Sequence, residues 1–136
     1  MASSRGDCDG VDAWVLGTEE RLQHATPIVR GIDPDGGLPT EATLLAHERT
    51  MWGLATAQRQ SAPPPAAEEI NGVMVALFEG FAYAMAVFAD VAAGDEHPFF
   101  AQTKLNAGKG AIAEAGGDIA HVVLDLYPVL TTRCPR

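Results

Sequence analysis

Three side chains that bind metals share one predicted helical face near the end of the chain. Asp118, His121 and Asp125 stand at i, i+3 and i+7, and Glu114 lies one turn before them. Carboxylates and imidazole are ligands for divalent transition metals, so Asp118, His121 and Asp125 are candidate metal ligands. An acidic, solvated helix face explains the same spacing, and the Glu-x-x-His pairs typical of di-iron bundles do not occur in the sequence.

A histidine and a methionine one turn apart suggest haem ligation. His47 precedes Met51 on the apolar stripe of a predicted helix, and four-helix bundles can hold haem through His and Met axial ligands. No Cys-x-x-Cys-His attachment site accompanies them, and methionine is also a common gap-filler in cores. We predict no resident cofactor. A haem- or metal-binding bundle that uses His47 with Met51, or the face of Asp118, His121 and Asp125, is the alternative function.

A Met- and Phe-rich set of residues is suited to bind a small apolar molecule. We expect such a molecule to lie among the predicted second, third and fourth helices, with His47 at its edge. Filling of the core is the simpler explanation for most of these residues, and the two interpretations stand side by side. The candidate ligand-binding residues are His47, Met51, Met74, Phe78, Phe81 and Met85.

The sequence offers no motif for nucleophilic catalysis. No Gly-x-Ser-x-Gly turn occurs, and both cysteines are better explained as a disulfide. Asp33, Asp35 and Gly37 resemble the opening of a calcium loop, but Leu44 stands where that loop requires a bidentate glutamate. We therefore expect a non-enzymatic protein. An enzyme with a site assembled from acidic residues across helices is left open.

Four segments have the apolar spacing of amphipathic helices, and none predicts a strand. The last segment has an inner stripe that includes Ala115, Val123 and Leu130. Turns rich in Gly, Asp, Ser and Pro separate the segments. Because an even number of antiparallel helices returns the chain to its starting end, we predict an all-α, up-down antiparallel four-helix bundle. The expected helices cover roughly residues 9–30, 40–60, 66–93 and 98–130.

The chain has two cysteines, Cys8 and Cys134, one near each end. The predicted bundle brings both ends together, so we expect a Cys8–Cys134 disulfide that joins the termini. A disulfide indicates an oxidising compartment, and we expect an extracytoplasmic protein, secreted or anchored at a surface. No apolar segment precedes Cys8, so we expect the natural signal peptide to be absent from this chain. Residues 1–7 are expected to form a disordered N-terminal segment, and residues 8–136 a single bundle domain.

The charge balance limits the classes of partner. The formal net charge is −9, from nine Lys and Arg against eighteen Asp and Glu. Such a surface repels phosphate backbones, so we predict no binding to nucleic acid. The predicted third helix carries a single charge, Glu79, between Gly72 and Ala89. Its two-faced pattern favours a buried helix of a bundle, and we predict no membrane span.

The outer side of the third helix is poor in charge. Small residues such as Gly72, Ala76 and Gly80 surround Tyr83 there. Solvent-facing helix surfaces usually carry more Lys and Glu, so we expect a protein partner or a homodimer at this strip.

Taken together, these features predict a non-enzymatic, extracytoplasmic helical binding or interaction domain of unknown ligand, which accepts a small apolar molecule in its Met- and Phe-rich core.

Overall fold

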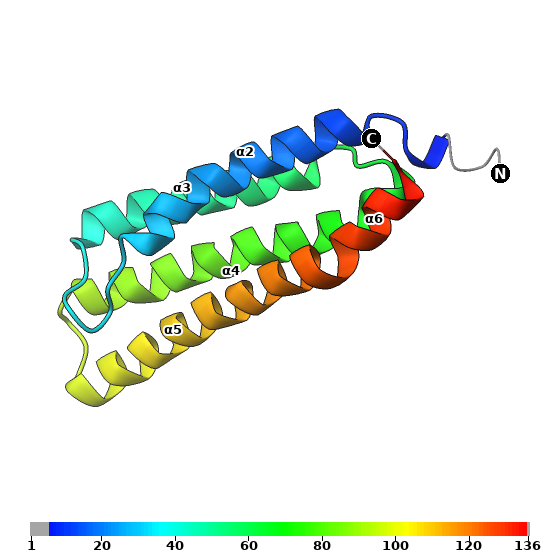
Figure 1. Ribbon diagram of the computed structural model, residues 1–136. Coiled ribbons are helices and arrows are strands. Elements are labelled where there is room, and N and C mark those ends of the chain that lie inside the picture. The colour runs from blue at the N-terminus through cyan, green and yellow to red at the C-terminus, as the bar shows by residue number, and fades with distance from the viewer. Residues whose placement is uncertain (1–5, 136) are drawn as a thin grey trace.

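The computed structural model describes residues 6–135, and these form long helices that alternate in direction (Figure 1). No strand occurs among the described residues, where an isolated bridge between Asp33 and Gly37 closes a turn. The prediction of an all-α, up-down antiparallel four-helix bundle is confirmed. The elements are α2 (Val11–Arg30), α3 (Glu41–Arg59), η1 (Pro65–Ala67), α4 (Glu68–Ala92), α5 (Pro98–His121), η2 (Val122–Leu126) and α6 (Tyr127–Arg133).

Local side chains explain where two of the long helices begin. Thr40 Oγ1 accepts a hydrogen bond from the backbone N–H of Thr43 at 3.2 Å, which caps the start of α3. His97 Nδ1 accepts from the backbone N–H of Phe99 at 3.1 Å, and Pro98 follows at the first helical position of α5. These caps satisfy amide groups that the helices leave without partners.

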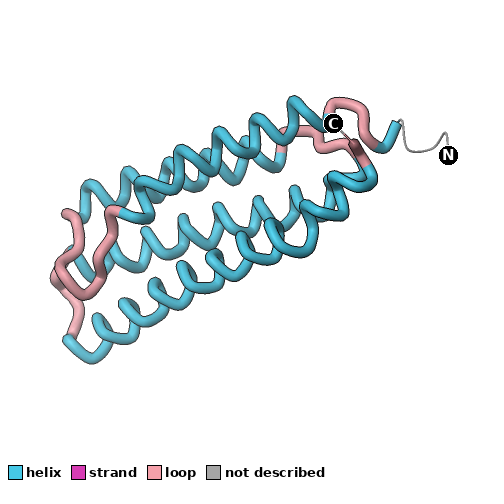
Figure 2. Tube along the Cα trace, viewed as in Figure 1, coloured by secondary structure: helices cyan, strands magenta, loops and turns pink. Residues whose placement is uncertain are grey.

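Helix α4 is the central element of the bundle. It packs along the length of both α3 and α5, whereas α2 approaches α3 and α4 closely at few positions. Figure 2 shows the connecting loops gathered at the two ends of the bundle. The position of α2 therefore depends on a small number of specific contacts.

The core lies mainly between α3 and α4. The predicted buried face of α4 is confirmed, since its Met and Phe side chains point into the interior. At about 25 cal/mol per Å² of apolar surface, this face supplies much of the driving force for folding. The largest fully buried side chains are Phe78, Phe88, Leu44, Met51, Leu77, Met85 and Gln58.

Helix α5 joins the bundle through small residues. Gly108 and Ala115 are its buried positions. A Cβ atom added at Gly108 would lie 2.4 Å from a ring carbon of the fully buried Phe88. Glycine at this position therefore lets α5 approach α4 closely, although glycine is a poor helix former.

The predicted inner stripe of the last helix is wrong at Val123. That side chain is 57% exposed, whereas Ala115 and Leu130 are buried as expected. The reason is the π-helical turn η2, in which the chain gains close to one extra residue per turn. This turn rotates Val123 away from the core, and the continuous helix expected up to Leu130 is divided into α5, η2 and α6.

The predicted Cys8–Cys134 disulfide is present and joins the termini at one end of the bundle. The two Cα atoms lie 5.6 Å apart. Beside the disulfide, Arg133 Nη2 lies 2.9 Å from Asp7 Oδ2. Of the predicted N-terminal segment, residues 1–5 lie outside the described part of the chain.

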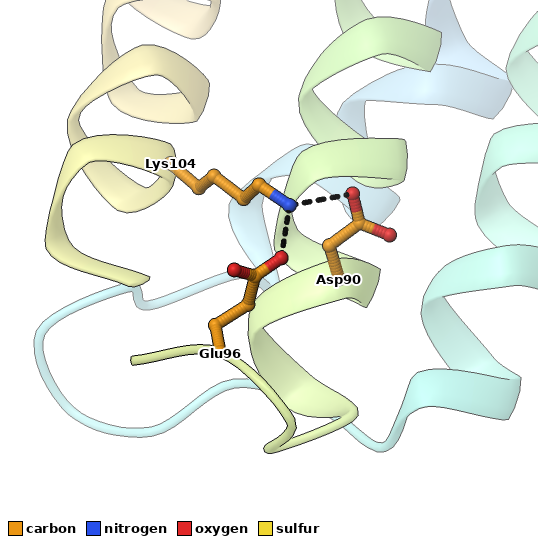
Figure 3. A network of polar contacts seen from close by, with 3 residues as sticks. All are labelled: Asp90, Glu96 and Lys104. Atoms are coloured by element: carbon orange, nitrogen blue, oxygen red, sulfur yellow. Dashed lines mark hydrogen bonds and ion pairs between the residues drawn. The ribbon is translucent and has the colours of Figure 1, made fainter. Parts of the chain in front are cut away.

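At the opposite end, an ion-pair network holds the α4–α5 connection. Lys104 Nζ lies 3.3 Å from Asp90 Oδ2 and also donates to Glu96 (Figure 3). The hydrogen bond to Glu96 raises the pKa of Lys104 above its ordinary value, and Asp90 adds to this effect. Lys109 Nζ lies 2.6 Å from Asp35 Oδ1 and so connects α5 to the loop that follows α2.

One helical segment, Pro65–Ala92, is long and apolar enough to cross a membrane by length and composition. In the most apolar 18-residue stretch of this segment, 50% of the residues are buried inside the bundle. The core helix of a soluble protein has the same length and composition, so this segment does not by itself indicate a membrane span.

Candidate functional site

A buried polar network fixes α2 against the rest of the bundle near the disulfide. Trp14 Nε1 donates to Asn71 Oδ1 at 3.0 Å and lies 3.2 Å from Ser61 Oγ. Gln58 Nε2 donates to the same Asn71 oxygen at 2.8 Å and to Thr18 Oγ1 at 3.0 Å. Gln58 and Asn71 are the buried polar residues of the described chain. Their hydrogen bonds therefore join α2, α3 and α4 at one point.

An apolar cleft opens between α2, α4 and the residues of η2 and α6. Its volume is about 190 Å³, and apolar atoms form almost all of its wall. Met74, Val15 and Ile70 are its most buried residues, whereas Val123 lies at its exposed edge. We call this site the apolar cleft. It is lined by Trp14, Val15, Thr18, Glu19, Leu22, Ile70, Met74, Val122, Val123 and Tyr127.

The exposed apolar surface around η2 is unusual for a solvated turn. No residue of η2 is buried, and Leu124 is 72% exposed. Val129 on α6, shortly after this turn in the chain, is also exposed. Exposed apolar surface beside a cleft is typical of interaction sites, and π-helical turns are frequent at functional sites. The apolar cleft and its surroundings are therefore the strongest candidate for the functional site.

Most of the predicted ligand-binding residues are core side chains. Met51, Phe78 and Met85 have no exposed surface, and Phe81 is buried as well. His47 is half-buried, one turn before Met51. Of the six predicted residues, Met74 is the one that lines the apolar cleft. A haem held by His47 and Met51 would have to displace closely packed core side chains.

The predicted metal ligands come together only in part. His121 Nδ1 lies 2.9 Å from Asp125 Oδ2, and both side chains are exposed. Asp118 instead lines an open groove on the outer side of α4 and α5. Within residues 6–135, no three His, Cys, Asp or Glu side chains are grouped as a metal site requires. The π-helical turn between His121 and Asp125 changes the angular spacing that the regular helix predicted.

The strip of small residues expected on α4 forms one wall of that outer groove. The groove has a volume of about 450 Å³, and Tyr83 beside it is 51% exposed. Glu114 and Asp118 give it an acidic edge. We call this groove the small-residue groove. Its lining residues are Ala76, Gly80, Tyr83, Ala107, Gly110, Ala111, Glu114, Ala115 and Asp118.

The apolar cleft and the polar network were not anticipated from the sequence. Gln58 falls on the apolar stripe of α3, and a polar residue on such a stripe is the signal that could have identified a buried hydrogen-bonded group. The cleft has no comparable signal, because the π-helical turn that exposes Val123 depends on packing in three dimensions.

No protein-family model matches this chain, and no curated protein or solved structure is similar to it. A fold of four helices supports many unrelated functions. The function is therefore argued from the chemistry of the sites.

Proposed function

We propose that this protein is a non-enzymatic, extracytoplasmic binding domain that accepts an apolar group in the apolar cleft. The supporting observation is the cleft itself, with a volume of about 190 Å³ and walls that are almost entirely apolar. Burial of apolar surface drives association, and a preformed apolar cleft lowers the cost of ordering the binding surface.

The volume limits the size of the ligand. An engineered cavity of about 150 Å³ in another protein binds benzene, so the apolar cleft accommodates a group of similar size. Pockets that enclose larger ligands measure about 300–1,000 Å³. The ligand is therefore an aromatic ring or a short alkyl chain, either as a small molecule or as one side chain of a protein partner.

The location of the ligand follows from close packing. Met51, Phe78 and Met85 are fully buried against other core side chains, and such interiors leave few voids larger than a water molecule. Met74 contributes both to the core and to the apolar cleft. A ligand bound at Met74 needs no opening of the core, which makes the apolar cleft the better position.

The disulfide supports an extracytoplasmic location. Disulfides persist in oxidising environments and are rare among cytosolic proteins. The Cys8–Cys134 bond closes nearly the whole described chain, so a reducing compartment would remove a constraint on the entire bundle. The protein therefore acts outside the cytoplasm, secreted or attached to a surface.

The experiment uses Trp14 as the reporter. Trp52 is 44% exposed and does not line the apolar cleft, so Trp52→Phe leaves Trp14 as the single tryptophan. Titration of the Trp52→Phe protein with toluene is expected to change Trp14 fluorescence in a saturable way. A bulkier side chain at the edge, Val123→Phe, is expected to weaken toluene binding about tenfold, or about 1.4 kcal/mol.

The matched control is Leu124→Phe. Leu124 follows Val123 directly, is more exposed and does not line the apolar cleft. Its substitution is expected to leave toluene binding unchanged. Equal toluene affinity in the Val123→Phe and Leu124→Phe proteins, or no saturable response at all, would contradict the proposal.

A further inference from the structure

A second cleft lies on the other side of α2, where the first turns of this helix meet the connector after α3. Its volume is about 260 Å³, and it is more polar than the apolar cleft. Trp14 lines both clefts, one on each side of the helix. We call this second site the polar cleft, and it is lined by Gly10, Ala13, Trp14, Gly17, Arg21, Ser61 and Ala62.

The guanidinium group of Arg21 is held in one orientation inside the polar cleft. Arg21 Nε donates to Gln58 Oε1 at 2.6 Å. Gln58 is fully buried, and its amide nitrogen is fixed by Thr18 and Asn71. The network that positions α2 therefore also orients the arginine.

The outer nitrogen atoms of Arg21 lie over a glycine. A Cβ atom added at Gly17 would lie 3.4 Å from both Nη1 and Nη2. Because glycine has no side chain, no atom beyond the backbone of residue 17 covers this side of the guanidinium, and Gly17 and Arg21 both line the polar cleft. The two parallel N–H groups of such a fork match the two oxygen atoms of a carboxylate.

Arg21 also forms no ion pair within the described part of the chain. Among the described residues, the ion pairs involve Arg59, Lys104, Lys109, His121 and Arg133 but not Arg21. Partial burial lowers the pKa of Arg21, and the neighbouring Glu20 offsets this effect in part. Since this half-buried guanidinium forms no ion pair with a described carboxylate, a bound anion would stabilise it.

We propose that the polar cleft binds a carboxylate, with Arg21 Nη1 and Nη2 each donating one hydrogen bond to it. A monoanion fits better than a phosphate dianion because the strongly acidic protein repels two negative charges more than one. Ala13 and Trp14 provide apolar surface for a short substituent beside the carboxylate. The ligand is a small organic acid or the free carboxyl end of a peptide.

The experiment follows the Arg21 Nε–H and Gly17 amide signals by ¹⁵N–¹H NMR while sodium benzoate is added. Saturable shifts of both signals at millimolar benzoate are expected, with little or no shift for benzamide, its neutral counterpart. Equal shifts with benzoate and benzamide, or the absence of saturable shifts, would overturn the proposal. A short peptide with a free C-terminus, compared with its amidated form, then separates the two sources of carboxylate.

Two variants test the role of the guanidinium. Arg21→Gln is expected to weaken benzoate binding at least tenfold, whereas Arg30→Gln, on the same helix and outside the polar cleft, leaves it unchanged. Arg21→Gln also removes a bond to Gln58, so Gly17→Leu serves as a second variant that keeps this bond and covers the outer nitrogen atoms. Undiminished benzoate binding in folded Gly17→Leu protein would overturn the proposal.

The two clefts are distinguished by one further comparison, because the benzene ring of benzoate also fits the apolar cleft. Val123→Phe fills the edge of the apolar cleft and is expected to leave the benzoate shifts at Arg21 and Gly17 intact. Loss of benzoate binding in Val123→Phe protein, with retention in Gly17→Leu protein, would assign the ligand to the apolar cleft. That outcome would refute the carboxylate site and leave the proposed function in place.

Discussion

Trp14 Nε1 donates a hydrogen bond to Asn71 Oδ1 at 3.0 Å and so links α2 to α4 inside the bundle. Asn71 Oδ1 also accepts from Gln58 Nε2, which brings α3 into the same contact. Because α2 approaches its neighbours closely at few positions, these bonds fix its rotation. Both clefts are lined by Trp14, so the network determines the shape of both.

Loss of the Asn71 side chain is expected to destabilise the protein. Asn71→Ala removes one acceptor each from the indole of Trp14 and the amide of Gln58, while Ser61 Oγ and Thr18 Oγ1 still accept from these groups. A total cost of about 1–3 kcal/mol is therefore expected. Urea unfolding measures the change. The control is Asn106→Ala, an exposed asparagine of α5, which is expected to alter stability by less than about 0.5 kcal/mol. Equal effects of the two substitutions would show that the network contributes no stability.

Two glycines of α5 are expected to respond in opposite directions to alanine. At Gly108 the added methyl group meets the ring of Phe88, and such overpacking costs about 1–3 kcal/mol, more than the gain in helix propensity of about 1 kcal/mol. At Gly116 nothing lies within 4 Å of the added atom, so Gly116→Ala is expected to stabilise by up to about 1 kcal/mol. Thermal unfolding of both variants checks the sign. A stabilised Gly108→Ala protein would contradict the close contact between α5 and α4.

Reduction of the disulfide is expected to lower the free energy of unfolding by about 5 kcal/mol. The bond joins residues separated by 126 positions, and the chain-entropy model assigns a constraint of this size to so long a loop. Guanidinium unfolding with and without reductant measures the difference. The double variant Cys8→Ser and Cys134→Ser serves as the control, because reductant should not change its stability. An unchanged midpoint for the wild-type protein would contradict the predicted contribution.

The ion pairs of Lys104 are expected to lose their contribution at high pH. Glu96, and then Asp90, raise the pKa of Lys104 in the folded protein above its ordinary value of about 10.4. The contribution to stability is therefore complete below that ordinary value and disappears as the pH rises through the raised one. Melting temperatures of wild-type and Lys104→Met protein should differ at neutral pH and converge at a pH where the amino group of Lys104 has lost its proton in the folded protein. A difference that persists at that pH would indicate a packing effect of the lysine stem.

Homodimer formation stays a prediction, and the small-residue groove is the surface to test. Small residues allow a helix of a second copy to approach closely, while Glu114 and Asp118 repel the same charges on that copy. Sedimentation velocity is expected to show a mass that rises with concentration, and more strongly at high salt. Gly80→Phe, inside the groove, should abolish this rise, whereas Gly53→Phe on α3 should not. A constant monomer mass across a tenfold concentration range would exclude a dimer at these concentrations.

The bundle could be predicted from the sequence because its determinants are local or simple. Apolar spacing marked the four helices, and the placement of Cys8 and Cys134 required both ends to meet. The buried face of α4 followed from helical periodicity alone. Each of these features depends on residue types at a fixed spacing, which a single chain displays.

The sites could be predicted only in part. The π-helical turn exposes Val123, and no residue pattern marks such a turn in advance. Asp118 lines the small-residue groove, whereas His121 contacts Asp125. The orientation of Arg21 depends on Gln58, which lies 37 residues further along the chain. Contacts between distant residues arise from the fold, so the two clefts became visible only in the structure.

The Cys8–Cys134 bond also has a mechanical consequence. Tension applied to the two ends of the chain passes through this covalent bond and bypasses the helices between the two cysteines. The residues that line both clefts lie between the two cysteines, so they keep their arrangement while the ends are pulled. Under force, the oxidised protein therefore does not extend between its two cysteines, whereas the reduced protein can be unfolded by pulling on its ends.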